Sequence, residues 1–377
     1  MKSSVRLGLA VLGLVAALAA LAGTAAAAPG GGHGSGRVVF VLTDNTAGNQ
    51  VVAYDRLGDG SLKPAGTYST GGAGGILAGS VVDHTASQGA LAYDPARGLL
   101  FAVNPGSSSV AVFSVSGDRL TLDQVVSSGG SFPVSIAAHG GVVYVLNALD
   151  GGSLQGFAVV GDQLVALPGS SRALGLDPTA APQFTHTPGQ VAFTPDGSQL
   201  LVTTKANGND IDVFGVGPLG YLSASPTVNS EPGTVPFAVT FDGQGHPVVA
   251  EAGTNALATF ALAADGTLTA LQTVATGQAA TCWIASAGPY LYASNAGSGT
   301  ESGFASGPGG ALSLLGATPT DAGTVDAAAT PDGAFLYVQA GKSGIVDAYR
   351  VNGDGSLTAV GSVVVAGASG GEGIVAL

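Results

Sequence analysis

Short apolar runs alternate with turns rich in Gly, Asp, Asn and Pro along most of the chain. One stretch runs Gln190-Val-Ala-Phe193, Thr194-Pro195-Asp196-Gly197 and then Leu200-Leu-Val-Thr203. Proline at the second turn position presets φ, and glycine at the last position accepts a left-handed backbone. The stretch therefore predicts a β-hairpin, and residues 327–338 repeat it.

An aromatic residue recurs within a strand-like run at intervals of 44 to 59 residues: Tyr54, Phe113, Phe157, Phe214, Phe260, Phe304 and Tyr349. Seven or eight residues after each aromatic, a leucine closes a tight turn: Leu62, Leu120, Leu164, Leu222, Leu268, Leu312 and Leu357. Three of these turns contain Asp-Gly, beginning at Asp59, Asp265 and Asp354, and this pair favours a hairpin turn with positive φ. The spacing predicts seven copies of one unit.

Each unit contains four predicted antiparallel strands, named a to d in chain order. A unit of about 45 residues cannot bury both faces of its sheet alone, but seven units arranged radially can. We therefore expect an all-β fold, a seven-bladed β-propeller with four antiparallel strands per blade. The first unit begins at residues 38–42 with a strand-b pattern, so residues 370–377 should supply its missing inner strand and close the ring.

The N-terminus has the organisation of a secretion signal. Lys2 and Arg6 precede an apolar run over residues 7–22, and small residues follow it as far as Ala28. We expect a cleaved signal at 1–27, a Gly-rich flexible leader at 28–37 and one propeller domain at 38–377. The alternative is a retained membrane anchor, but the run of about 16 residues is shorter than the roughly 20 needed to span a bilayer.

Composition excludes several classes of protein. A hydrophobic content of 46% excludes disorder of the main body, and a formal charge of −13 argues against nucleic-acid binding. A single cysteine excludes a disulfide framework and a thiolate zinc site. We expect a secreted, extracellular monomer with no cofactor, no metal and no membrane association after signal cleavage.

Strand direction assigns the connections to two faces. The Pro-Asp-Gly and Asp-Gly turns share one face, and the b-to-c loops and d-to-a connections share the other, which we call the loop-bearing face. Two d-to-a connections are long, Gly71–Gln88 and Leu176–Pro188, and they contain His84 and His186. Long loops on a rigid scaffold commonly carry function.

Polar and aromatic side chains on the loop-bearing face form a candidate small-molecule site. The expected ligand-binding residues are Asn104, Asn147, Gln190, Phe237, Trp283, Asn295 and His84. The candidate catalytic residues are Glu251, His186 and Lys205, and Glu251 stands out because the other blades place uncharged groups at its position.

Structural interpretations of these residues stay open. Asn at a strand end commonly forms a turn. His84 and His186 could be surface loop residues, and Lys205 a solvated loop charge. Cys282 in a predicted inner strand is typical of a small buried hydrophobe.

The Thr-Pro-Asp-Gly-x-x-Leu-[Leu/Tyr]-Val unit, the aromatic strand and the Asp-Gly-[Ser/Thr]-Leu turn resemble the seven-bladed lactonase family over residues 38–377. That family includes 6-phosphogluconolactonases and fungal carboxymuconate cyclases. The resemblance implies His, Glu and Arg side chains around the channel mouth. This chain departs from it, with Thr187-Pro188-Gly189, Pro236-Phe237-Ala238 and Asn295-Ala296-Gly297 where the family has His or Arg.

Two main functional hypotheses remain, beside a third, a purely structural or cell-surface interaction module. The first is a secreted lactonase that hydrolyses or forms a lactone at the channel mouth, with Glu251 as general base and His186 or Lys205 assisting a developing oxyanion. The alternative is a non-catalytic extracellular propeller that binds a small ligand, a glycan or a protein. The missing arginines agree with this alternative, and they leave a phosphorylated sugar lactone without an arginine clamp.

Overall fold

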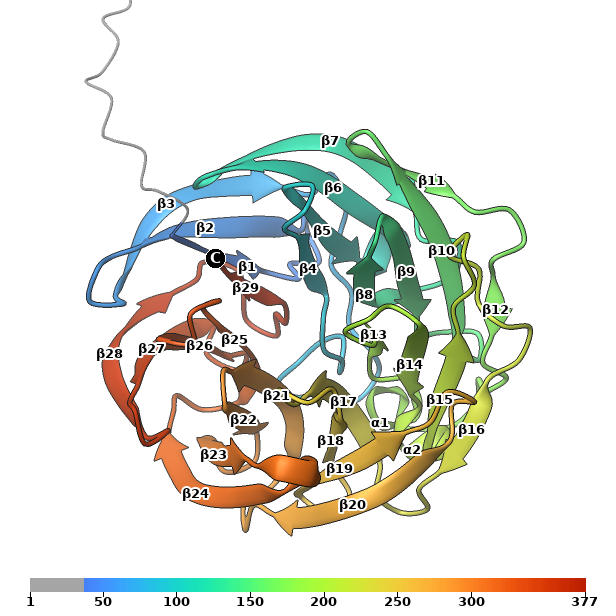
Figure 1. Ribbon diagram of the computed structural model, residues 1–377. Helices are drawn as coiled ribbons and strands as arrows, with labels where there is room; N and C mark the ends of the chain where they lie inside the picture. Colours follow the sequence, from blue (N-terminus) through green and yellow to red (C-terminus); the bar gives the residue numbers. More distant parts are fainter. Residues whose placement is uncertain (1–36) are drawn as a thin grey trace, which may run out of the picture. The chain divides into compact units, whose positions relative to one another are not determined.

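Seven antiparallel sheets stand around a common axis in the computed structural model (Figure 1). The structure describes residues 37–377, so the expected signal at 1–27 and the leader up to residue 36 lie outside the described residues. Six sheets have four strands, and the third carries a short fifth strand. The predicted seven-bladed β-propeller is confirmed.

Each blade runs from an inner strand near the axis to an outer strand at the rim. Blade one contains, in that order, β29 (Ile374–Ala376), β1 (Val38–Leu42), β2 (Gln50–Arg56) and β3 (Leu62–Ser69). Blade two contains β4 (Leu91–Asp94), β5 (Leu99–Asn104), β6 (Ser109–Ser116) and β7 (Arg119–Ser127). Blade three contains β8 (Pro133–His139), β9 (Val142–Asn147), β10 (Ser153–Val160) and β11 (Gln163–Ala166), with β12 (Arg172–Ala173) also paired to β10. Blade four contains β13 (Val191–Phe193), β14 (Gln199–Thr203), β15 (Asp210–Gly215) and β16 (Thr227–Ser230).

The remaining three blades follow the same order. Blade five contains β17 (Pro236–Phe241), β18 (Pro247–Glu251), β19 (Ala256–Leu262) and β20 (Leu268–Ala275). Blade six contains β21 (Thr281–Ala287), β22 (Tyr290–Asn295), β23 (Thr300–Ser306) and β24 (Leu312–Pro319). Blade seven contains β25 (Thr324–Ala329), β26 (Phe335–Ala340), β27 (Ile345–Val351) and β28 (Leu357–Val364). The short helices are η1 (Pro105–Ser107), α1 (Gln183–His186), α2 (Lys205–Gly208) and η2 (Pro308–Gly310).

Burial follows the position of each strand within its blade. Second strands such as β5 and β26 are buried along their whole length because neighbouring blades cover both of their faces. Outer strands such as β28 contain only half-buried and exposed residues. The seven recurring aromatic residues all lie buried on the third strands. In five blades the pairing with the outer strand shifts register directly before that aromatic, a β-bulge that increases the local twist.

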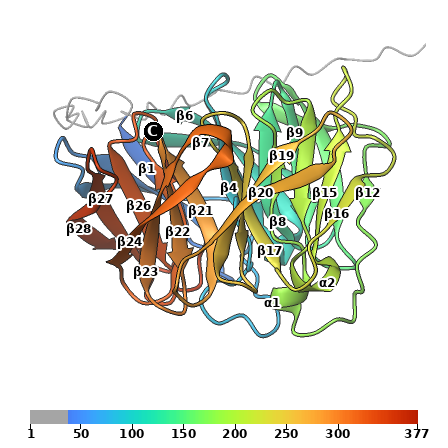
Figure 2. The same cartoon turned by 60° about the horizontal axis from the view of Figure 1, so that its bottom comes forward.

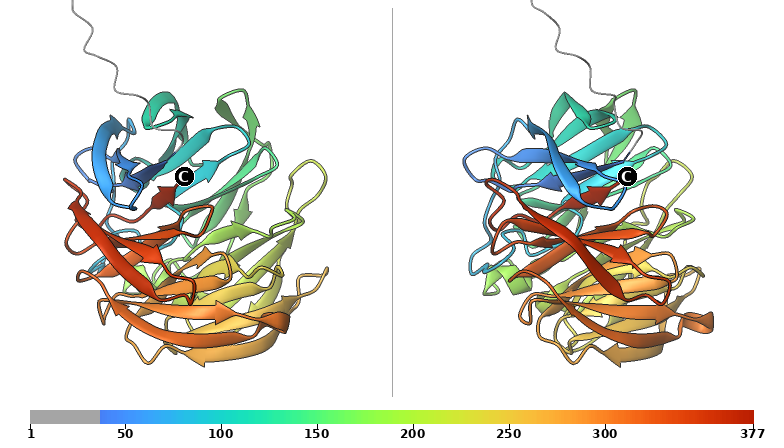
Figure 3. Two further views of the ribbon diagram at one scale, coloured as in Figure 1. Left: turned by 60° about the vertical axis from the view of Figure 1, so that its left-hand side comes forward. Right: turned by 90° about the vertical axis from the view of Figure 1, so that its left-hand side faces the viewer.

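The C-terminal strand closes the ring, as the sequence predicted. β29 pairs antiparallel with β1, with Val39 opposite Ala376 and Val41 opposite Ile374. In side view it lies against the first blade (Figure 3). The amide of Leu377 also donates to the Val38 carbonyl at 2.8 Å. Blade one is therefore assembled from both ends of the described chain.

The two long connections lie on the loop-bearing face, where α1 and α2 are also found (Figure 2). They contact each other, because the amide of Ala78 donates to Gln183 Oε1 at 2.9 Å. In the part of the chain that the structure describes, no helix is long and apolar enough to cross a membrane.

Candidate functional site

A cavity of about 530 Å³ opens on the loop-bearing face, between the long connections and the entries of the inner strands of blades five and six. Its walls are mostly apolar and include Val81, Val82, Phe184, Val235, Phe237 and Trp283. The charged residues among its lining are Asp83, Lys205 and Lys342. An apolar cavity with a few polar groups is typical of a small-molecule site.

Phe237 and Trp283, two of the expected ligand-binding residues, form one wall of the cavity. Their ring centroids lie 4.9 Å apart at an interplanar angle of 62°, an edge-to-face contact. Trp283 Nε1 donates to the Ser87 carbonyl at 2.6 Å, which fixes the indole against the first long connection. Strands β17 and β21 each shift register beside these residues, and such bulges re-aim side chains.

Lys205 is fully buried in the wall of the cavity, so its interpretation as a solvated loop charge is wrong. Its Nζ donates to the carbonyls of Ala86 at 2.6 Å and Phe184 at 2.7 Å, and to Thr187 Oγ1 at 3.1 Å. Burial lowers the pKa of Lys205 to about 7, against the opposing attraction of Asp83. The three hydrogen bonds tie both long connections to blade four.

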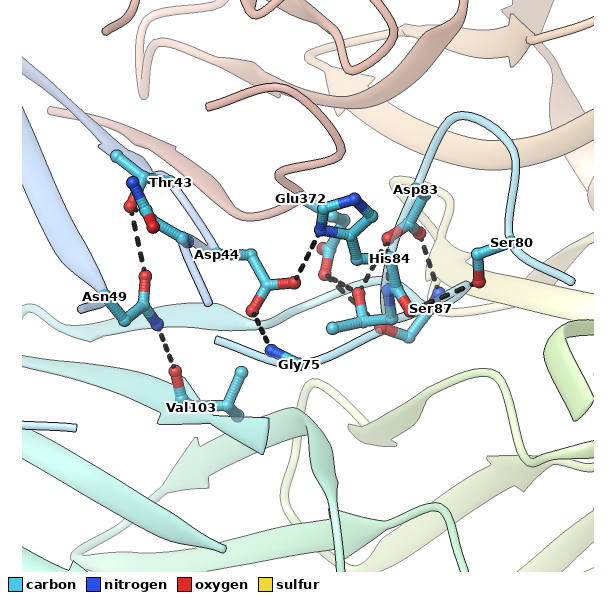
Figure 4. A network of polar contacts seen from close by, with 12 residues as sticks. Thr43, Asp44, Asn49, Gly75, Ser80, Asp83, His84, Ser87, Val103 and Glu372 are labelled. Atoms are coloured by element: carbon cyan, nitrogen blue, oxygen red, sulfur yellow. Dashed lines mark hydrogen bonds and ion pairs between the residues drawn. The ribbon is translucent and has the colours of Figure 1, made fainter. Parts of the chain in front are cut away.

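Asp83 is the buried carboxylate of the cavity, and it is not among the residues predicted from the sequence. Its Oδ1 accepts from the amide and the hydroxyl of Thr85, both at 2.8 Å. Its Oδ2 accepts from the Ser87 amide at 3.0 Å (Figure 4). Burial raises the pKa of Asp83 above its usual range. A signal was present in the sequence, because Asp83 adjoins His84 in a long connection.

Glu372 lies close to Asp83. Its Oε1 accepts from the Gly89 amide at 2.8 Å. Its Oε2 accepts from the Ser87 hydroxyl at 3.3 Å (Figure 4). Burial, then the nearby carboxyl of Asp326, raises the pKa of Glu372 well above its usual range. No group of three or more His, Cys, Asp or Glu side chains among residues 37–377 has a geometry that could hold a metal ion.

The three candidate catalytic residues are not brought together. Lys205 lines the cavity, but Glu251 does not, and its Oε2 accepts from the Thr254 hydroxyl at 2.8 Å. Burial raises the pKa of Glu251. His186 faces a separate small pocket of about 20 Å³, with its Nδ1 2.8 Å from Thr185 Oγ1.

The predicted asparagines hold neighbouring loops instead of lining the cavity. All three are fully buried. Their amides are engaged as follows: Asn104 Oδ1 accepts from Thr70 Oγ1 at 2.6 Å, Asn147 Nδ2 donates to the Ser128 carbonyl at 3.2 Å, and Asn295 Oδ1 accepts from Thr281 Oγ1 at 2.6 Å. These contacts agree with the loop-forming interpretation of strand-end asparagine.

Gln190 and His84 also lie outside the cavity walls. Gln190 Oε1 accepts from the Val239 amide at 2.6 Å and so joins blades four and five. His84 Nδ1 lies 3.4 Å from Asp44 Oδ2 (Figure 4). The contact with the Asp44 carboxylate raises the pKa of His84, and burial raises the pKa of Asp44 to about 7.

Cys282 lines the cavity as a thiol. Burial raises its pKa to about 12, so the thiolate form is disfavoured. The disfavoured thiolate agrees with the interpretation of Cys282 as a small hydrophobe, but the residue is half-buried and not fully buried.

Four non-glycine residues of the wall have left-handed backbone conformations. They are Ala86, Lys205, Val235 and Ala280, with φ between 46° and 56°. Such a conformation costs on the order of 1–3 kcal/mol per residue and is least favourable for a β-branched residue such as Val235. The shape of the cavity is therefore kept against a local conformational cost, as is common at functional sites.

Comparisons with known proteins agree with the fold. The model of the family described as "Lactonase, 7-bladed beta-propeller" matches residues 73–370. A search of curated proteins found no match.

Several solved structures share the propeller architecture. A Bacteroides uniformis protein assigned as a 6-phosphogluconolactonase has a TM-score of 0.72 at 20% identity, covering 91% of this chain and 100% of its own. A similarly assigned Bacteroides fragilis protein has a TM-score of 0.69 at 19% identity, covering 93% and 100%. The periplasmic gluconolactonase of Pseudomonas aeruginosa has a TM-score of 0.68 at 20% identity, covering 90% and 98%. At these identities the likeness is one of fold.

Proposed function

The chain belongs to the seven-bladed β-propeller lactonase family, and from this premise we propose that it hydrolyses a lactone in the cavity on its loop-bearing face. One observation carries the proposal: the mostly apolar cavity contains a buried carboxylate, Asp83, and a buried amine, Lys205. Fold alone would not support an activity, because propellers host many functions. The pair supplies a base and a positive charge, which acyl transfer requires.

Asp83 is the proposed general base. Its Oδ2 accepts one hydrogen bond, from the Ser87 amide, and keeps a lone pair for a water molecule. The carboxylate takes a proton from that water as the water oxygen bonds to the lactone carbonyl carbon. When the ring C–O bond then breaks, the Asp83 carboxyl returns the proton to the leaving oxygen and a hydroxy acid is released.

Lys205 is proposed to stabilise the charge that develops on the carbonyl oxygen. Its Nζ is held by three protein acceptors, so the ammonium is fixed and acts through its field. Its positive charge also favours the ionised form of Asp83. Lys342 is exposed at the rim, where it can attract the carboxylate product.

A panel of aliphatic, aromatic and sugar lactones tests the activity, with the unmodified protein compared with its Asp83→Asn and Glu251→Gln variants. We expect Asp83→Asn to lower kcat by about 100-fold or more, the usual contribution of a general base, and Glu251→Gln to stay within a few-fold of the unmodified protein. Urea unfolding of each variant controls for folding.

Two outcomes would contradict this scheme. Loss of turnover in Glu251→Gln with activity retained in Asp83→Asn would move the base to Glu251. Absence of turnover of every lactone by the folded protein would remove the hydrolytic proposal and favour the non-catalytic binding propeller.

We also propose that the protein acts outside the cell, on the signal-like organisation of residues 1–27. Mass spectrometry of the protein from culture medium should find an N-terminus at Ala28. An intact Met1, or retention with the cells, would contradict export.

A further inference from the structure

We propose that the cavity selects uncharged lactones with an apolar substituent, such as an alkyl or aryl group, over polyhydroxylated or phosphorylated sugar lactones. This inference rests on the proposed function in taking the ligand to be a lactone. It concerns which lactone the cavity accepts, and binding can test it separately from turnover.

The apolar surface extends from the floor of the cavity to its lip. Phe237 and Trp283 are almost fully buried in the wall, whereas Val81 at the lip is 78% exposed. Val82 and Val235 lie between these extremes. A bound alkyl or aryl group would therefore be removed from water at the lip, and it would contact apolar side chains from the lip to Phe237 and Trp283.

The hydrogen-bond donors of Lys205 and Trp283 in the wall are already engaged within the protein. All three protons of the Lys205 ammonium are donated to protein acceptors. The Trp283 N–H is donated to the Ser87 carbonyl, and Asp83 Oδ1 already accepts two hydrogen bonds. A sugar lactone would bring several hydroxyl groups into this cavity, and most of them would lose water without gaining a partner.

A phosphate group would bind less favourably in this cavity than a hydroxyl group. The described lining contains no arginine to hold it in a bidentate contact, and Lys205 has no free donor. Asp83 adds a negative charge to the wall, and the chain as a whole carries −13. Of the lining cations, only Lys342 at the rim is exposed to a phosphate.

Trp283 provides the readout, because it is the only tryptophan in the chain and it lines the cavity. Its fluorescence can be titrated with δ-decalactone and with glucono-δ-lactone, which share a six-membered ring and differ in carrying an alkyl chain or hydroxyl groups. We expect δ-decalactone to bind at least about tenfold more tightly.

Two variants test whether δ-decalactone binds in this cavity. Val81→Asp places a carboxylate on an exposed residue of the lip, so the fold should be kept while the affinity for δ-decalactone falls about fivefold or more. The matched control is Val364→Asp on the outer strand β28, where the side chain is 75% exposed, and it should leave the affinity unchanged.

The outcomes separate the two proposals. Tight binding of δ-decalactone without turnover of any lactone would support the selectivity and contradict hydrolysis. Equal or tighter binding of glucono-δ-lactone would overturn the selectivity whatever the turnover. A fluorescence response to neither lactone, or an unchanged affinity in Val81→Asp, would overturn it as well.

Discussion

Lys205 shows how one buried side chain organises the cavity. Its amine joins Ala86 in the first long connection to Phe184 and Thr187 around the second. A methionine at this position would keep most of the packing but leave two carbonyls and a hydroxyl without their donor. Buried acceptors without partners destabilise a fold.

We therefore expect Lys205→Met to lower the free energy of unfolding by about 2–4 kcal/mol at pH 7. The loss should grow between pH 7 and pH 9. The pKa of Lys205 in the folded state, about 7, lies below its ordinary value of 10.5. Between these two values the unfolded state binds more protons than the folded state, so Lys205 makes stability rise with pH. The variant lacks this contribution. Urea unfolding at both pH values measures the change, with Lys63→Met at an exposed position as the control. An equal loss at both pH values would contradict the lowered pKa.

The sequence could indicate part of this site. Phe237 and Trp283 were found because each stands at the entry of a predicted inner strand, and strand periodicity fixes that place. Asp83 was missed because a long connection has no periodicity to show which side chain turns inward. The sequence shows polar residues at the strand ends, but it does not show whether each one contacts a ligand or another part of the protein. Asn104 and Asn295 hydrogen-bond within the protein, to Thr70 and Thr281.

At the scale of the element, β29 is a short strand with a large structural role. It covers the inner edge of β1 and places Ile374 and Ala376 among buried apolar residues. Without it, the unpaired edge of β1 and its apolar neighbours would face water.

We expect deletion of residues 374–377 to lower the free energy of unfolding by about 3–5 kcal/mol, through lost strand pairing and lost apolar burial. Guanidinium unfolding followed by circular dichroism measures this. Val364→Ala on β28 is a matched control, because that side chain is exposed and should change stability by less than about 0.5 kcal/mol. An unchanged midpoint in the truncated chain would show that β29 does not stabilise the ring.

The repeated elements were predictable, because aromatic spacing and turn chemistry recur in each blade. The extra strand β12 was not. Its Arg172 donates to the carbonyls of Leu222 at 2.7 Å and Ser223 at 2.8 Å in the next blade. Contacts between residues about fifty positions apart leave no local pattern in the sequence.

For the pH dependence of the stability of the whole molecule, the burial of acidic residues matters more than their number. Several carboxyl groups among residues 37–377 are buried without a cation beside them. Burial raises the pKa of Glu301 to about 8 and the pKa of Asp326 to about 7. Glu301 Oε2 accepts from the Ser294 hydroxyl at 2.9 Å, while its Oε1 has no partner.

This arrangement predicts a protein that is more stable in mild acid than at alkaline pH. Carboxyls with raised folded pKa values bind more protons in the folded state between about pH 4.5 and pH 8, so stability falls as pH rises through that range. Thermal unfolding should give a higher Tm at pH 5 than at pH 8. Glu301→Gln should reduce the difference, because glutamine stays neutral at both values. A higher Tm at pH 8 in the unmodified protein would contradict the prediction.

Closure by β29 also sets an order of events. The first blade to leave the ribosome is the last to be completed, because its inner strand comes from the far end of the described chain. Until then the inner edge of β1 has no partner strand, and the ring can close only once both ends of the described chain have met. For a protein that is threaded through a membrane pore before it folds, this delay is an advantage. A nascent chain that cannot finish its first blade stays open to translocation until residues 374–376 arrive.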